Sequence, residues 1–169
     1  MNAERERNIV ITGFMATGKT TVGGQVARLV GRPFVDADEE IIRRAGMSIP
    51  QIFERDGEAG FRTLERQVCF DLASERKMVI ATGGGMLVDP ENRRRMQATG
   101  FVVCLDAEAE IIGARLANNA ERPLSGDWAA LLDKRRAVYA AIPLHINTTG
   151  KTPEGIAQEI VALWQNDSA

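Results

Sequence analysis

The sequence predicts an α/β fold in which helices cover a parallel β-sheet. Two observations support this prediction: short apolar runs alternate with longer segments of helical periodicity, and a glycine-rich phosphate-binding pattern follows the first apolar run. With 169 residues and 44% hydrophobic content, the chain is long enough to bury one core and hardly long enough for two. We therefore expect a single domain that comprises residues 1–169.

The apolar runs have the length of strands, and they lie at residues 8–12, 34–36, 78–82, 101–105 and 144–147. Residues 19–30 and 61–72 repeat apolar side chains at the spacing of amphipathic helices. Ser48 and Thr152, each with a proline close behind, are typical of helix starts. Residues 117–127 are polar and aperiodic, which predicts a mobile surface loop.

Composition argues against several classes of function. No stretch approaches the roughly 18 apolar residues of a membrane span, and the charged N-terminus is unlike a secretory signal. A net charge of -2, without interleaved aromatic and basic residues, argues against nucleic acid as a partner. Cys69 and Cys104 lie in apolar stretches, which indicates core residues rather than a disulfide or a metal site. We expect a cytoplasmic monomer that acts on small molecules.

The phosphate-binding pattern is the strongest functional signal. Its residues Gly13, Gly18, Lys19 and Thr20 complete the sequence Gly-x-x-x-x-Gly-Lys-Thr between a strand and a helix. Glycines let backbone N–H groups turn towards phosphate, and the helix N-terminus adds its positive end. The lysine reaches the outer phosphates and the threonine hydroxyl ligates Mg²⁺. This segment therefore predicts a site for a nucleoside triphosphate.

Further clusters concern the group that receives the phosphoryl. Asp36 and Asp38 lie at the end of a short predicted strand and point to the same side of it, near the phosphate loop if this strand neighbours the first. One could then hold Mg²⁺ through water and the other could meet a substrate hydroxyl. Three consecutive glycines at 83–85 would let a ligand lie against the backbone. An anionic substrate needs separated cations that converge on it. The candidates for this role are Arg62, Arg122 and Arg135.

Together these segments resemble the shikimate kinase family. The resemblance rests on ITGFMATGKTTVG, FVDADEEI, GEAGFR, TGGG, ERPL and KRRAVY, in this order, from residue 11 to residue 139. It implies a five-stranded parallel sheet of the P-loop, nucleoside-monophosphate-kinase-like type, built as a three-layer sandwich. It also implies a lid at about 117–127, a substrate-binding region at about 36–65, and transfer of the γ-phosphoryl of ATP to the 3-hydroxyl of shikimate.

For the nucleotide, the resemblance makes Lys19 catalytic through the outer phosphates, Thr20 a Mg²⁺ ligand and Asp36 an acid that holds the metal through water. Arg122 matches a catalytic lid arginine that closes over the phosphates. The other ATP-binding positions are Gly13, Ala16, Thr17, Gly18, Thr21, Arg115, Lys151 and Pro153. Mg²⁺ is the expected cofactor, with ATP as the co-substrate.

For shikimate, the resemblance assigns Asp38 to the hydroxyl groups, as a catalytic residue, and Arg62 to the carboxylate. Arg135 matches a second carboxylate contact, and it is preferred to Arg136 because the family's arginine lies four residues before a tyrosine, here Tyr139. The remaining positions are Phe53 and Phe61 as apolar walls, Glu65 as the partner of Arg62, and Gly83, Gly84 and Gly85.

Each assignment has a simpler structural alternative. The two aspartates also suit a helix N-terminus, the glycines an ordinary turn, and the phenylalanines a core. Arg62 and Glu65 could be a solvated pair one helical turn apart, and Arg135 could belong to an exposed basic face. His145, the single histidine, has no acids or cysteines arranged near it as ligands and is expected on the exposed side of an edge strand.

The lid departs from the family's pattern. Ser125 stands where a second leucine is usual, Ala137 and Val138 replace Pro-Leu, and the interval from Arg122 to Arg135 is short. We expect such a lid to close less completely over the substrates. Two other functions stay open: a related kinase for an acceptor such as gluconate, and a nucleotide-gated binding module without shikimate-dependent ADP release.

Overall fold

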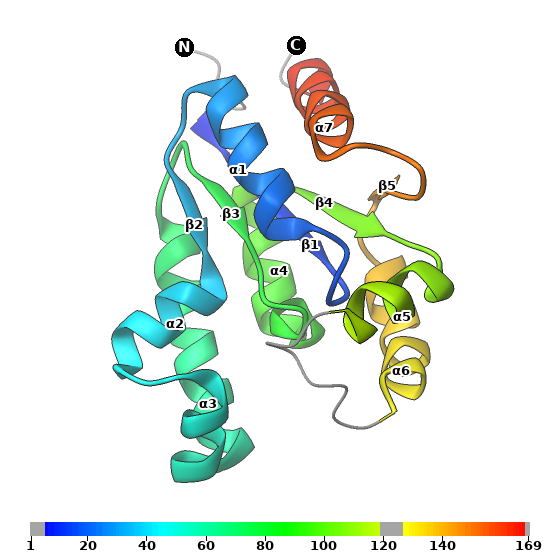
Figure 1. Ribbon diagram of the computed structural model, residues 1–169. Coiled ribbons are helices and arrows are strands. Elements are labelled where there is room, and N and C mark those ends of the chain that lie inside the picture. The colour runs from blue at the N-terminus through cyan, green and yellow to red at the C-terminus, as the bar shows by residue number, and fades with distance from the viewer. Residues whose placement is uncertain (1–5, 119–126, 168–169) are drawn as a thin grey trace.

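A parallel sheet forms the centre of the molecule (Figure 1). The computed structural model describes residues 6–118 and 127–167, and within these the sheet has five strands in the order β2-β3-β1-β4-β5. The strands are β1 (Asn8–Gly13), β2 (Phe34–Asp36), β3 (Val79–Ala81), β4 (Gly100–Asp106) and β5 (Leu144–Asn147). The five predicted strands are all present, with bounds that differ by one residue at most, and the fold class is confirmed.

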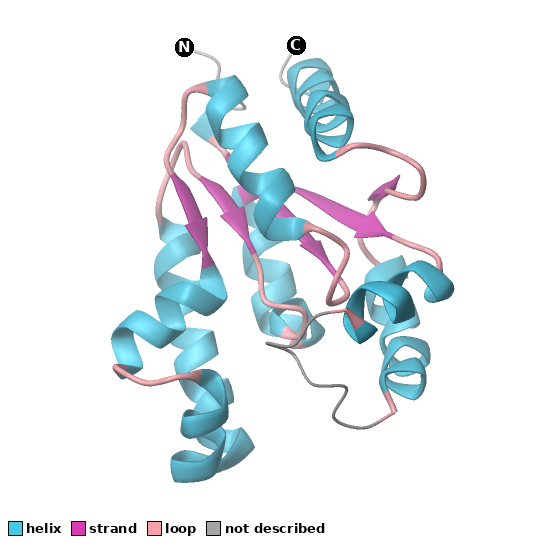
Figure 2. Ribbon diagram, viewed as in Figure 1, coloured by secondary structure: helices cyan, strands magenta, loops and turns pink. Residues whose placement is uncertain are grey.

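Helices cover both faces of the sheet, so the domain has three layers (Figure 2). Alternate residues of a strand point to opposite faces. Ile9 and Ile11 accordingly pack with α1 (Lys19–Val30) and α7 (Pro153–Asp167), whereas Val10 belongs to the core on the other face. That second core takes in side chains of α2 (Ala37–Ala45), α3 (Ile49–Ser74), α4 (Pro90–Thr99), α5 (Ala109–Ala117) and α6 (Trp128–Ala140).

Helix α3 is longer than the predicted segment 61–72. It begins as predicted at Ser48, whose side chain accepts a hydrogen bond from the backbone N–H of Gln51, while the Gln51 side chain accepts one from the Ser48 N–H. Gly57 interrupts the helix with φ 70° and ψ -178°, a conformation that suits glycine. The apolar repeat therefore predicted only the second piece, because the helix axis changes at the kink.

Both cysteines are buried thiols without a disulfide, as predicted. Burial raises the pKa of Cys69 and of Cys104 to about 12, so both are protonated at neutral pH. Among the helices of the described ranges, none combines the length and the apolar character needed to cross a membrane.

Since the sheet is parallel, the carboxyl ends of its strands meet at one edge. Gly13 ends β1, Asp36 ends β2 and Thr82 follows β3 there. Ligands of open parallel sheets bind outside this edge. The phosphate loop, the two predicted aspartates and the three glycines therefore meet in space although they are far apart in sequence.

Candidate active site

The loop between β1 and α1 has the backbone conformation that a phosphate loop needs. Gly13, Ala16 and Gly18 have positive φ values of 143°, 61° and 92°. A Cβ on Gly13 would lie 2.5 Å from the carbonyl oxygen of Leu105, so a close approach also requires glycine there. Within the described part of the chain, no side chain caps the first turn of α1. Its N–H groups are thus oriented for an anion.

Lys19 is the first residue of α1, and its side chain folds back against this loop, where it is 9% exposed. Its Nζ donates a hydrogen bond to the carbonyl oxygen of Phe14 at 2.8 Å, and the Thr17 hydroxyl donates to the same oxygen at 2.8 Å. Arg115 of α5 donates to the carbonyl oxygen of Ala16 at 2.8 Å. These bonds hold two cations against the loop, where phosphate charge would need them.

Thr20 and Asp36, the predicted metal residues, are in direct contact. The Thr20 hydroxyl donates to Oδ2 of Asp36 at 2.6 Å. The other carboxylate oxygen accepts from the backbone N–H groups of Asp38 and Glu39 at 2.9 and 3.3 Å, which caps α2. Asp36 therefore has the helix-capping role as well as a place beside the loop. A hydroxyl and a carboxylate are oxygen donors of the kind Mg²⁺ takes, so the pair fits that ion.

A pocket of about 300 Å³ lies beside the phosphate loop, between α5 and the start of α7. The predicted residues Thr21, Arg115, Lys151 and Pro153 line it together with the loop residues. Thr148 and Ile156 line it too, and sequence reasoning missed them. Thr148 directly follows β5 at the carboxyl edge of the sheet, a position that could have indicated it.

Asp38 and Gly83 are packed against each other. A Cβ added to Gly83 would lie 2.4 Å from Oδ1 of Asp38, so a larger residue at this position would displace that carboxylate. Asp38 extends from the first turn of α2, and Gly83 follows β3. The predicted hydroxyl-binding acid is thus placed at the glycine segment.

Two guanidinium groups flank the backbone of Gly85. Nη1 of Arg62 and Nη2 of Arg135 would lie 3.0 and 3.1 Å from a Cβ at this position. Arg62 comes from α3 and Arg135 from α6. Nη1 of Arg62 also lies 2.7 Å from Oε1 of Glu65. The structure therefore brings the two predicted carboxylate-binding arginines to one short piece of glycine backbone.

Glu65 is a buried carboxyl rather than half of a solvated pair, since 2% of it is exposed. Burial raises its pKa, and the Arg62 guanidinium opposes that rise. With one oxygen bonded to Arg62, the carboxyl holds this arginine in a fixed position. The ring of Phe61 lies beneath the Arg62 guanidinium at 5.2 Å, and the Phe53 ring is 4.7 Å from that of Phe61.

Arg135 and Arg136 point to different surroundings. Arg136 bonds Asp133 at 2.9 Å, and both side chains are exposed. Arg135 faces the glycine segment instead. The hydroxyl of Tyr139, buried on the same helix, donates to the carbonyl oxygen of Gly84. The sequence singled out Tyr139 only as a landmark, yet its side chain connects α6 with the glycine segment.

Arg122 and most of the predicted lid, 119–126, lie outside the described residues, so the structure does not place them. The described chain stops after α5 and resumes at Asp127, whose side chain caps α6 by accepting a hydrogen bond from the Ala130 N–H.

The expectation for His145 is wrong in one respect. It lies on the edge strand β5 and is partly exposed, as predicted. However, an acid and a cysteine do lie next to it: its Nδ1 is 2.7 Å from Oδ2 of Asp106, and Cys104 is its register partner on β4. A neighbour on a paired strand is invisible in a linear sequence.

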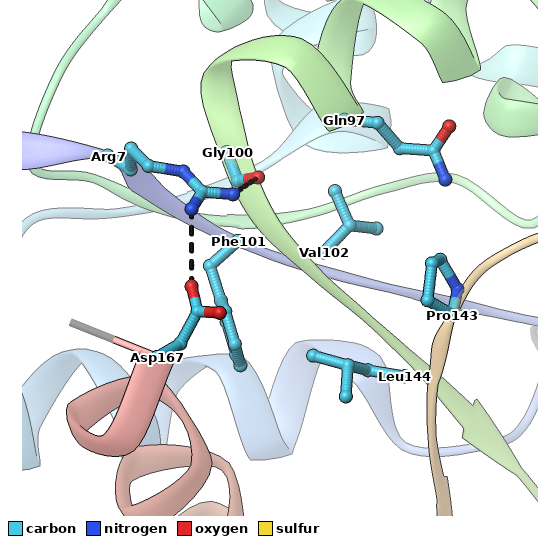
Figure 3. A pocket seen from close by; sticks show the side chains of 8 residues that line it. All are labelled: Arg7, Gln97, Gly100, Phe101, Val102, Pro143, Leu144 and Asp167. Atoms are coloured by element: carbon cyan, nitrogen blue, oxygen red, sulfur yellow. Dashed lines mark hydrogen bonds and ion pairs between the residues drawn. The ribbon is translucent and has the colours of Figure 1, made fainter. Parts of the chain in front are cut away.

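Another pocket, of about 340 Å³, lies near the amino ends of β4 and β5 (Figure 3). It contains the ion pair of Arg7 with Asp167, together with Gln97 and apolar side chains. Ligand chemistry of a parallel sheet belongs to the carboxyl edge. We therefore place the candidate active site at the phosphate loop and not in this pocket.

A phosphate loop, an adjacent oxygen pair suited to Mg²⁺, an acid and two converging arginines define a P-loop kinase of small molecules. Comparison with protein families then specifies the family, since the sequence model of the shikimate kinase family matches residues 15–165. This chain belongs to the shikimate kinase family.

Individual relatives agree with this assignment. A shikimate kinase of Geobacter sulfurreducens is 45% identical over 163 residues, which cover 93% of this chain and 90% of the relative. One of Dechloromonas aromatica is 50% identical over 121 residues, or 72% of this chain and 66% of the relative. The solved structure of a shikimate kinase from Acinetobacter baumannii in complex with shikimate aligns with a TM-score of 0.90 at 37% identity, covering 97% of this chain and 96% of that one.

Proposed function

We propose that this protein transfers the γ-phosphoryl of ATP to the 3-hydroxyl of shikimate, giving shikimate 3-phosphate and ADP. The observation that carries the proposal is the convergence of Arg62 and Arg135 on Gly85, at the same sheet edge as the phosphate loop. Two guanidinium groups suit one carboxylate, and the bound shikimate of a structural relative supports this choice of acceptor. Gluconate remains the alternative acceptor to be tested.

In this mechanism Asp38 orients the attacking hydroxyl and accepts its proton. The bond from the shikimate oxygen to the γ-phosphorus forms while the bond from that phosphorus to the bridging oxygen of ADP breaks. Lys19 stabilises the charge on the outer phosphates. Thr20 and Asp36 would hold Mg²⁺, which, when bound, neutralises charge on the β and γ phosphates. Catalysis of this kind is mostly positioning and electrostatics.

Arg122 is assigned to the lid that closes over the phosphates, by resemblance alone. An arginine in that role contributes as much as ~10³–10⁵ in rate. Because the interval from Arg122 to Arg135 is shorter than is usual in the family, we propose that this lid closes less completely over the substrates.

Binding of shikimate is assigned to residues of α3, α6 and the glycine segment. Arg62 and Arg135 hold the carboxylate, Glu65 keeps Arg62 in place, and Phe53 with Phe61 forms an apolar wall against the ring. Phe53 is 38% exposed next to the buried Phe61, which leaves aromatic surface available to a ligand.

We further propose that the protein acts as a monomer in the cytoplasm, with ATP and shikimate as its substrates. The phosphate loop, the pair of Thr20 and Asp36 and the glycine segment with its two arginines meet within one chain, which supports this proposal.

The test is ADP release with MgATP, with and without shikimate, and with gluconate and quinate as controls. We expect strong stimulation by shikimate and none by gluconate. Stimulation by gluconate would instead identify the protein as a related kinase that uses gluconate as its acceptor. ATP binding without any stimulation by shikimate would support the nucleotide-gated module instead.

A further inference from the structure

Three side chains of metal-ligating type converge on β4 and β5, beside the phosphate loop but outside the residues assigned to ATP and shikimate. Within the described residues, Cys104, Asp106 and His145 each offer a ligand atom, and these atoms lie within 4.8 Å of one another. Nδ1 of His145 is 2.7 Å from Oδ2 of Asp106, and Sγ of Cys104 is 3.7 Å from Oδ1 of Asp106. Ligands of a tetrahedral Zn²⁺ site, at about 2.0–2.3 Å from the ion, are roughly 3–4 Å apart. Small side-chain adjustments would therefore complete such a site.

The pairing of the strands explains why these residues meet. Cys104 and Asp106 are two residues apart on β4, so they point to the same face of the sheet. The register pairs Cys104 with His145 of β5, which brings His145 to that face as well. All three residues lie on two hydrogen-bonded strands, so the backbone holds the candidate ligands in fixed positions relative to one another.

The orientation of the His145 ring directs Nδ1 into the cluster. Nε2 of His145 is 2.8 Å from the carbonyl oxygen of Ile142, so an N–H at Nε2 donates to that oxygen. With Nε2 in this bond, Nδ1 is the ring nitrogen that faces the Asp106 carboxylate and that a metal ion would use. A backbone carbonyl that fixes the tautomer of a ligating histidine is a common feature of metal sites.

An ion has a way into this cluster. A pocket of about 330 Å³ is lined by Asp106 and His145, together with Phe14, Thr17, Tyr139 and Arg136, whose guanidinium is paired with Asp133. Cys104 is not part of the pocket lining; it is buried among apolar side chains, with Sγ in contact with Asp106. The pocket offers both an entry path and room for a water molecule as a fourth ligand.

We propose that Cys104, Asp106 and His145 bind one Zn²⁺ ion per chain, with a water molecule from the pocket completing the coordination. Thiolate and imidazole ligands favour Zn²⁺, whereas Mg²⁺ prefers the all-oxygen pair of Thr20 and Asp36. On binding, the Sγ–Zn bond forms as the thiol proton leaves to solvent, and no electron is transferred. The ion is proposed as a ligand of this cluster and not as a participant in phosphoryl transfer, although the pocket beside it is also lined by Phe14 and Thr17 of the phosphate loop.

The test is a Co²⁺ titration of the full chain without nucleotide, followed by displacement with Zn²⁺. Co²⁺ bound to a thiolate gives a near-ultraviolet charge-transfer band, which Co²⁺ at the oxygen pair of Thr20 and Asp36 does not. We expect one band-forming ion per chain. Cys104→Ser should abolish the band, and Cys69→Ser, at the other buried thiol, should retain it. Absence of the band in the wild type, or its persistence in Cys104→Ser, would overturn the proposal.

A second variant guards against a folding defect in Cys104→Ser. His145 is partly exposed, so His145→Gln should fold. We expect its Co²⁺ affinity to fall by at least about tenfold, because loss of a residue that merely orients a metal ligand already costs about 10- to 100-fold. Zn²⁺ should raise the melting temperature of the wild type more than that of His145→Gln, with Mg²⁺ as the control ion. Equal Co²⁺ affinity in both proteins would mean that a proton alone lies between His145 and Asp106.

Discussion

Arg62 connects two environments, the buried carboxyl of Glu65 and the backbone of Gly85. We expect Arg62→Ala to raise KM for shikimate far more than KM for ATP. Charged hydrogen bonds are worth about 1.5–3 kcal/mol, so KM for shikimate should rise roughly 10- to 150-fold. Steady-state kinetics in both substrates measures this. A fraction of unfolded enzyme would lower the apparent kcat without separating the two KM values.

Arg66→Ala is the matched control. Arg66 lies one helical turn further along α3 and pairs with Asp89, away from the glycine segment. Its removal should leave both KM values unchanged. Equal increases in the two KM values for Arg62→Ala would contradict the assignment of this arginine to shikimate.

The buried carboxyl of Glu65 should make the free energy of unfolding depend on pH. Its pKa in the folded protein is raised above the ordinary value of 4.5, so the folded state binds the proton more tightly than the unfolded state. The stabilisation that Glu65 contributes through its proton is therefore complete below pH 4.5. It is lost as the pH rises from 4.5 through the raised pKa, and it does not change further above that pKa. Urea unfolding should show the wild type losing stability relative to Glu65→Gln over this window.

The comparison of the wild type with Glu65→Gln cancels the other titratable groups, because the two proteins differ at this one carboxyl. Parallel unfolding profiles of the two proteins across the window would show that burial of Glu65 does not affect its protonation.

At the scale of elements, Asp36 joins the end of β2 to the start of α2. Asparagine caps helices about as well as aspartate, so Asp36→Asn should keep the cap and lose the charge beside Thr20. We expect nearly unchanged thermal stability with about a tenfold higher Mg²⁺ requirement, the effect of one lost charged hydrogen bond. A Mg²⁺ titration of activity at fixed ATP measures it.

Asp89→Asn is the parallel change at another helix start, since Asp89 caps α4 in the same way. It should leave the Mg²⁺ requirement as in the wild type. Asp36→Ala should in addition cost about 0.5–2 kcal/mol of stability through loss of the cap. An unchanged Mg²⁺ requirement in Asp36→Asn would remove Asp36 from the metal site.

The turn after β3 allows a test of positioning. A methyl group on Gly83 would displace the Asp38 carboxylate, and a misplacement of 1 Å can cost about 10²-fold in rate. Gly83→Ala should therefore lower kcat strongly. Gly24→Ala in α1, where nothing lies within 4 Å, should leave kcat unchanged and stabilise the helix by up to about 1 kcal/mol. Similar kcat values for both variants would argue against Asp38 as the catalytic acid or base.

Features set by one contiguous segment could be predicted from the sequence. Contacts set by strand register or by the packing of a distant helix could not. The phosphate loop is one contiguous segment, so its residues could be assigned directly. The position of His145 beside Cys104 depends on strand register, and the bond from Tyr139 to Gly84 depends on how α6 packs. The kink at Gly57 escaped prediction because an isolated glycine within a helical pattern is usually tolerated.

At the scale of the whole molecule, the carboxyl edge of the sheet holds the candidate active site, whereas the amino edge holds an ion pair that we expect to affect stability alone. The pair of Arg7 and Asp167 lies at the amino edge and is partly exposed, so it should contribute at most about 1 kcal/mol. We expect Asp167→Ala to lower the free energy of unfolding by that amount or less and to leave kcat and both KM values unchanged. Unfolding curves and kinetics on one preparation check both points, and a changed KM would show that the two edges are coupled.

The strand order has a consequence for the way activity is acquired during folding. β1 and β2 come first in the chain, yet they are joined in the sheet only through β3, which lies more than 40 residues after β2 in the sequence (~43 from residue 36 to residue 79). The contact of Thr20 with Asp36 therefore depends on a non-local pairing, and such pairings are slow to form. In a refolding experiment, helical signal should return before phosphoryl transfer does. Enzymatic activity would then report the insertion of β3 between β1 and β2, on which the contact of Thr20 with Asp36 depends.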